Sequence, residues 1–136
     1  EKVTSELVAA INSNKYDFIV VNFANTDMVG HTGVWEAAKD AVAMIDKSLG
    51  AIYKAIKKQN ANMIITADHG NIEAMYLFDG EQPNTAHSTN PVPCVLVTEQ
   101  NDVSLSNGGL QDIAPTIIEL LKLPKSKLMT GNSLIK

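Results

Sequence analysis

The chain has 136 residues, the size of one domain, and 45% of them are hydrophobic. That apolar content argues against disorder, and no apolar run reaches the ~18 residues that a membrane-spanning helix needs. The net charge is −4 and all 11 basic residues are lysines, so the sequence lacks the basic stripe of a nucleic-acid-binding protein. We therefore expect a globular domain with neither nucleic acid nor membrane as a partner.

The predicted elements are, in chain order, a helix over 4–13, a strand over 18–23, a helix over 34–58, strands over 63–67 and 92–98, and a helix over 112–121. The helices have apolar residues three and four apart, and the strands are short apolar runs bounded by polar residues. Asp112 can cap the last helix. Strands that alternate with helices favour parallel pairing, so we expect an α/β fold with three layers, helix, sheet and helix, and a mainly parallel sheet.

The compartment and the extent of the chain follow from a few residues. Residues 1–5 contain no basic region before an apolar stretch, so we expect no signal peptide. The single cysteine, Cys94, lies in an apolar run and fits a reducing compartment, so we expect the protein in the cytoplasm.

The start without methionine suggests a piece of a longer chain. If the protein handles phosphate, the arginines that usually grip it must lie on another segment.

All three histidines stand in polar loops after apolar strands. Ligands of α/β folds gather outside the carboxyl ends of parallel strands, which brings at least two of these loops to one rim. Asp27 and His31 are four residues apart, so one helical turn would aim both side chains at the same point. Asp68 precedes His69, and a turn into Gly70 can aim both into the same pocket.

These side chains are of the types that bind divalent metals. Carboxylate and imidazole together suit an ion such as zinc or manganese. The candidate ligands are Asp27, His31, Asp68, His69 and His87. Five ligands are more than one tetrahedral ion needs and too few for two complete sites. The number suggests a dinuclear centre that lacks part of its shell, with ions roughly 3.5–4 Å apart.

Four motifs occur in order along the chain: NFANTDMVGHTG at 22–33, ITADHGN at 65–71, TAH at 85–87 and DIAPT at 112–116. Together they closely resemble the C-terminal part of the cofactor-independent phosphoglycerate mutase family, of the alkaline-phosphatase-like superfamily. The last motif alone would indicate only the wider superfamily, whereas the stretch DMVGHTG at 27–33 points to the mutases. The resemblance implies that residues 1–136 are the C-terminal segment of the metal-binding phosphatase domain. The N-terminal strands of this domain and the separate phosphotransferase domain would be absent.

The resemblance also implies ligands, cofactors and partners. In that family two manganese ions, or other divalent metals, sit in the phosphatase domain. Asp27, His31 and His87 would hold one ion, and Asp68 and His69 would hold the other with an aspartate and a nucleophilic serine from upstream. No catalytic nucleophile would then lie in this segment, and the segment alone would hold metal partially or not at all. The full-length protein would be a monomer, whereas this segment would self-associate through surface that the missing part covers.

The implied activity is the interconversion of 3-phosphoglycerate and 2-phosphoglycerate in glycolysis and gluconeogenesis, through a phosphoserine intermediate. The isolated segment is expected to be inactive. Two alternatives stay open. One is a related metal-dependent phosphohydrolase or phosphopentomutase, which would share the Asp68-His69-Gly70 triplet but not the DMVGHTG stretch at 27–33. The other is a non-catalytic domain that binds metal or is merely structural.

Overall fold

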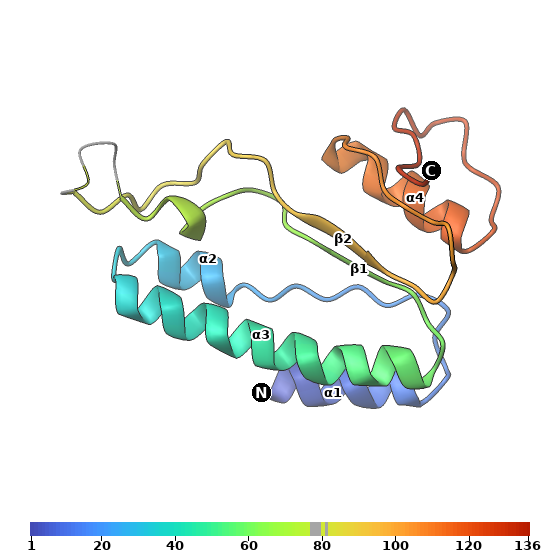
Figure 1. The fold of residues 1–136 in the computed structure, drawn as a ribbon, viewed down its shortest axis with the longest axis horizontal. Helices are drawn as coiled ribbons and strands as arrows, with labels where there is room; N and C mark the ends of the chain where they lie inside the picture. The colour runs from blue at the N-terminus through green and yellow to red at the C-terminus, as the bar shows by residue number, and fades with distance from the viewer. Residues whose placement is uncertain (77–79, 81) are drawn as a thin grey trace. The chain divides into compact units, whose positions relative to one another are not determined.

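The computed structural model describes residues 1–76, 80 and 82–136. These residues form two compact units (Figure 1). The first unit consists of Glu1–Ala61 and His69–Val92, and the second consists of Asn62–Asp68 and Pro93–Lys136. None of the helices described in these ranges is long and apolar enough to cross a membrane.

The first unit is built on three helices. They are α1 at Lys2–Asn12, α2 at Asn25–Gly30 and α3 at Trp35–Lys58. The helix expected over 34–58 is thus confirmed almost to the residue, and Ile52 and Ile56 lie on its buried face. α1 lies along α3 and runs in the same direction (Figure 1), with Thr4 Oγ1 donating to Ser48 Oγ at 3.0 Å. The short 3-10 helix η1, Ile72–Ala74, follows the loop that carries His69.

The strand expected over residues 18–23 is wrong. This segment belongs to no strand, and its apolar side chains are open to solvent: Phe18 is 51% exposed and Val20 is 77% exposed. A strand is defined by the hydrogen bonds that it exchanges with a neighbouring backbone. The described part of the chain gives this segment no such partner. The apolar side chains of residues 18–23 are therefore suited to burial, but most of them remain exposed to solvent in the structure.

The second unit holds a two-stranded sheet of β1, Met63–Thr66, and β2, Cys94–Val97. The strands are antiparallel, with Met63 opposite Val97 and Thr66 opposite Cys94. The expected parallel pairing is therefore wrong for these strands. Parallel neighbours need a crossover that usually contains a full helix, whereas the described part of this connection contains only η1. What the structure supports is a mixed fold of helices and strands with a small sheet.

Asp112 organises the rest of the second unit. It ends the 3-10 helix η2, Leu110–Asp112, and precedes α4, Ile113–Leu120. Its carboxylate accepts hydrogen bonds from Gly109 N at 2.8 Å and from Asn132 N at 2.7 Å, and these bonds hold the pKa of Asp112 below its usual value. Asp112 takes the N-cap position of α4, as expected, but its carboxylate makes no capping bond to this helix and instead joins the C-terminal segment to the turn before η2.

Candidate metal centre

α2 places Asp27 and His31 one helical turn apart. The turn is closed by His31 N, which donates to the carbonyl oxygen of Asp27 at 3.1 Å. Side chains at positions i and i+4 of a helix lie on the same face. As a result, Asp27 Oδ1 lies 3.3 Å from His31 Nε2. The structure therefore contains the helical turn that the four-residue spacing of Asp27 and His31 predicted.

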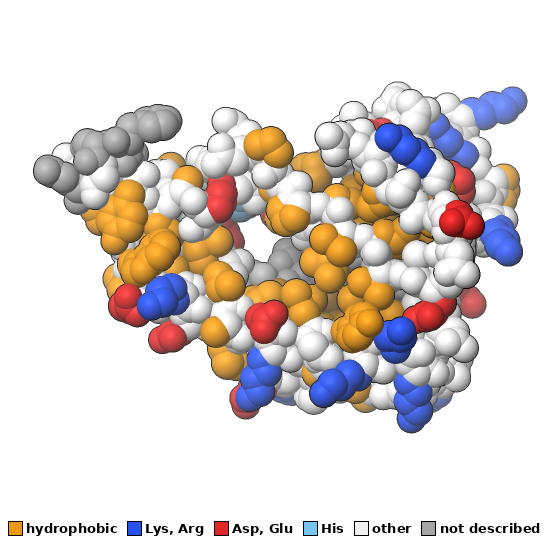
Figure 2. Space-filling view, in the orientation of Figure 1, with side chains coloured by type: hydrophobic (Ala, Val, Ile, Leu, Met, Phe, Trp, Pro, Cys, Tyr) orange, Lys and Arg blue, Asp and Glu red, His pale blue; other side chains and the backbone are white. Residues whose placement is uncertain are grey.

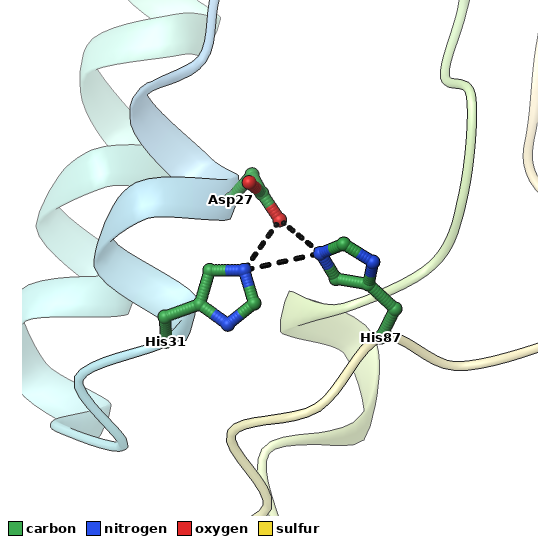
Figure 3. A group of neighbouring side chains, drawn as sticks. All are labelled: Asp27, His31 and His87. Atoms are coloured by element: carbon green, nitrogen blue, oxygen red, sulfur yellow. Dashed lines mark hydrogen bonds and ion pairs between the residues drawn. The ribbon is translucent and has the colours of Figure 1, made fainter.

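His87 reaches the same point from the loop that precedes β2. Its Nε2 lies 3.1 Å from Asp27 Oδ1 and 3.0 Å from His31 Nε2. Figure 3 shows the three side chains turned toward one another, Asp27 from α2, His31 from the C-cap of this helix and His87 from the loop. Metal-ligand atoms of all three lie within 4.8 Å of one another. Ser88, the next residue, donates its backbone N–H to the carbonyl oxygen of Gly70 at 2.8 Å, which holds the loop in place.

The donor atoms of this set suit a divalent metal. His31 Nδ1 lies 2.6 Å from the carbonyl oxygen of Thr85, and a carbonyl can only accept, so the proton of the neutral ring is on Nδ1. The lone pair of Nε2 then faces Asp27 and His87. This arrangement, in which the second ring nitrogen donates to a backbone carbonyl, is typical of metal-binding histidines. A carboxylate oxygen and two imidazole nitrogens this close together are stabilised by a positive charge among them.

Solvent has access to the three side chains. The side chain of Asp27 is 37% exposed, and those of His31 and His87 are 43% and 47% exposed. Three protein ligands leave coordination positions open in a catalytic metal site, where water or substrate binds. The exposure of this set fits a site of that open kind better than a closed structural one.

The other two expected ligands are not members of this set. The ring of His69, in the first unit, stacks on the ring of His87 with centroids 3.7 Å apart. Asp68 is exposed and ends the segment Asn62–Asp68 of the second unit. The structure thus brings together three of the five expected ligands within one unit, and it places His69 next to them.

Three residues that support the set were not singled out from the sequence. They are Asn71, Glu73 and Thr85. Asn71 follows Asp68-His69-Gly70 directly, so its amide could have been considered as a partner of a ligand. The role of Thr85 rests on its backbone carbonyl, for which side-chain type carries no signal. The Ser88 hydroxyl donates to Glu73, and this bond lowers the pKa of the Glu73 carboxyl.

Comparison with known proteins defines the class. The family model of the Metalloenzyme superfamily matches residues 1–125. The chain therefore belongs to the Metalloenzyme superfamily, in agreement with the donor set described above.

Within this class the chain is similar to one kind of enzyme. It is 53% identical over 135 residues to the 2,3-bisphosphoglycerate-independent phosphoglycerate mutase of Bacteroides fragilis, covering 99% of this chain and 27% of that protein. It is 49% identical over 134 residues to mutase 2 of Methanosarcina barkeri, covering 98% and 26%. These identities confirm the resemblance seen in the motifs.

A solved structure gives the same likeness. It is a crystal structure of Leishmania mexicana phosphoglycerate mutase at low cobalt concentration, which is 30% identical with a TM-score of 0.91. The match covers 99% of this chain and 28% of that one. The chain thus spans about a quarter of the length of the relatives that it matches (27% and 26%).

Proposed function

We propose that the chain is the C-terminal part of the metal-binding phosphatase domain of a metal-dependent phosphoglycerate mutase. The observation that carries this proposal is the convergence of Asp27, His31 and His87 in a segment that is 53% identical to a named mutase. A metal set inside such a match is unlike a chance cluster of surface histidines, because sequence similarity and donor geometry support it independently.

In this proposal Asp27, His31 and His87 hold one divalent ion, and Asp68 and His69 contribute to a second. We propose Mn²⁺ for both. A bound divalent ion supplies Lewis acidity that stabilises charge on phosphoryl oxygens and favours ionisation of a nucleophilic hydroxyl. The residues of this chain orient the ligands: the Thr85 carbonyl fixes the ring of His31, and Asn71 donates to Asp27.

The proposal extends to the whole protein. The nucleophilic serine, the remaining strands of a three-layer and mainly parallel sheet, and the substrate-binding arginines would come from chain outside residues 1–136. The whole protein would act in the cytoplasm as a monomer, with small-molecule phosphoglycerates as substrates and without nucleic acid or membrane partners. It would interconvert 3-phosphoglycerate and 2-phosphoglycerate through a phosphoserine.

A chimera tests this function. The matching 27% of the Bacteroides fragilis mutase is replaced by this chain. The chimera is expected to convert 3-phosphoglycerate in the presence of Mn²⁺. Asp27→Ala is expected to lower kcat/KM by about 10³-fold or more, because it removes one of the three side chains that hold the first ion. Asp40→Ala, an exposed carboxylate on α3, is the matched control and should leave the activity unchanged.

Other outcomes favour the alternatives. A folded chimera that binds Mn²⁺ without turning over phosphoglycerate would contradict the mutase proposal and favour a non-catalytic metal-binding domain. Turnover of phosphopentoses or of simple phosphate monoesters in place of phosphoglycerate would favour the related phosphopentomutases or phosphohydrolases.

Self-association is a separate expectation for this chain alone. Residues 18–23 expose apolar side chains along an extended backbone, with Val20 77% exposed. Apolar side chains also remain visible at the surface over the N-terminal part of α3 (Figure 2). Unpaired extended segments template pairing with another chain, and large apolar patches favour association.

We therefore expect light scattering to show a mass that rises with protein concentration. The variant Val20→Lys should shift the equilibrium toward monomer, because it places a charge in the extended segment. Val3→Lys, at a 47% exposed position of α1, is the control. A constant monomer mass at the highest concentration would show that the exposed segment drives no association.

A further inference from the structure

Asn71 lies directly behind Asp27. Its Nδ2 donates to Asp27 Oδ1 at 3.0 Å, and only 5% of the residue is exposed. The nitrogen of the amide must face the carboxylate, since its oxygen in that place would bring two acceptors together. The side chain thus holds Asp27 by a charge-assisted hydrogen bond, on the carboxylate oxygen that also faces His31 and His87.

The other end of the Asn71 amide is confined by α2. A Cβ atom added to Gly30 would lie 2.1 Å from Asn71 Oδ1, so only glycine leaves room at this position. Oδ1 is buried and accepts no hydrogen bond from the described residues. A buried acceptor without a partner costs stability, so stability alone does not explain this side chain. The Nδ2 group of the amide, which donates to Asp27, is the part of the side chain that serves the site.

Glu73 joins Asn71 to the loop of His87. Its Oε2 accepts from Asn71 N at 2.7 Å. Its Oε1 accepts from the Ser88 hydroxyl and from Asn90 Nδ2, the latter at 3.0 Å. Ser88 follows His87 directly. One carboxylate therefore binds both the residue that holds Asp27 and the residue next to His87.

We propose that Asn71 and Glu73 are positioning residues of the Asp27–His31–His87 set. They act through Asp27 and through the loop of His87, and neither touches the ion. This inference rests on the proposed function, in which the set holds a divalent metal. α2 and the His87 loop are distant in the sequence, so their ligands meet only if the folded chain fixes their separation. Asn71 and Glu73 supply that connection.

Calorimetric titration of the chain with Mn²⁺ tests the inference. Asn71→Ala and Glu73→Gln are each expected to weaken Mn²⁺ binding about 10–100-fold, the usual effect of losing a partner that orients a metal ligand. The matched controls are Asn12→Ala, which removes a hydrogen bond from the Gln59 amide, and Glu36→Gln, which removes a surface ion pair with Lys39. The controls are expected to keep the affinity of the unsubstituted chain.

A double-substitution cycle separates positioning from general stability. Gly30→Ala leaves Asn71 in place but fills the space of its Oδ1, so it should displace the amide and weaken Mn²⁺ binding. Alanine is otherwise favoured over glycine inside a helix. In the double variant Gly30→Ala/Asn71→Ala the methyl group meets no amide. This variant should therefore bind Mn²⁺ no more weakly than Asn71→Ala alone.

The outcomes are distinct. If Asn71→Ala and Glu73→Gln bind Mn²⁺ as tightly as the unsubstituted chain, the inference is overturned while the proposed function stands. If the unsubstituted chain is folded by NMR and binds no Mn²⁺, the inference is overturned, and if the folded chimera binds none either, the proposed function is overturned with it. If Asn71→Ala loses its helical circular dichroism, or if the effects of Gly30→Ala and Asn71→Ala simply add, Asn71 serves stability and the inference is wrong.

Discussion

We expect Mn²⁺ binding to weaken strongly when the side chain of Asp27, His31 or His87 is removed. The loss should exceed the about 10–100-fold that follows from removing a residue that only orients a ligand. Each supplies one of three ligand atoms that lie within 4.8 Å of one another. Two remaining ligands seldom hold a divalent ion against water. Titration calorimetry on Asp27→Ala, His31→Ala and His87→Ala measures the effect.

His69→Ala and Asp40→Ala are the controls for these substitutions. His69 stacks on His87 but lies outside the set, so its removal should weaken binding less than the removal of either other histidine. Asp40 is an exposed carboxylate of α3 and should have no effect. Equal losses for His69→Ala and His87→Ala would show that the ion is held by a different group of ligands.

The chain alone is expected to show no turnover of 3-phosphoglycerate. In the proposed function the nucleophilic serine lies outside residues 1–136, and loss of a nucleophile costs about 10⁶-fold in kcat. The arginines that would grip the substrate are absent too, since all 11 basic residues are lysines. A coupled assay with excess Mn²⁺ and ³¹P NMR both measure the conversion.

A preparation of Asp27→Ala, purified in the same way, controls for contaminating host enzyme. Turnover that disappears in this variant would belong to the chain and would contradict the proposal. Phosphate recovered on one of the chain's own serines by mass spectrometry would contradict it equally, because it would place a nucleophile within residues 1–136.

The helices were more predictable from the sequence than the strands. α3 covers the expected residues almost completely. Its apolar spacing extends over many turns, so a single residue that departs from the pattern does not change the prediction of a helix. Residues 18–23 have a strong strand composition, yet they form no strand. A strand depends on its neighbour, and composition does not reveal whether the neighbour is present. The antiparallel pairing of β1 and β2 was missed because parallel pairing was inferred from the alternation of strands and helices, whereas the described part of the connection between these two strands contains only η1.

The candidate site was predicted in part, and for a mixture of reasons. The spacing of Asp27 and His31 is local, and the helical turn at the end of α2 brings the two side chains together. The approach of His87 was expected from a parallel sheet that these residues do not form. In the structure it follows from the bond between Ser88 N and the Gly70 carbonyl. The supporting bonds of Asn71 and Glu73 join residues far apart in the sequence, which periodicity and spacing do not detect.

The most direct measurement is a crystal structure of the chain grown with Mn²⁺, with anomalous data that locate the ion. We expect a peak bonded to an Asp27 carboxylate oxygen and to Nε2 of both His31 and His87, at about 2.0–2.2 Å. The Nδ1–H of His31 should still donate to the Thr85 carbonyl, as it does at 2.6 Å here. An ion bound elsewhere, or bound to His31 through Nδ1, would contradict the proposed centre.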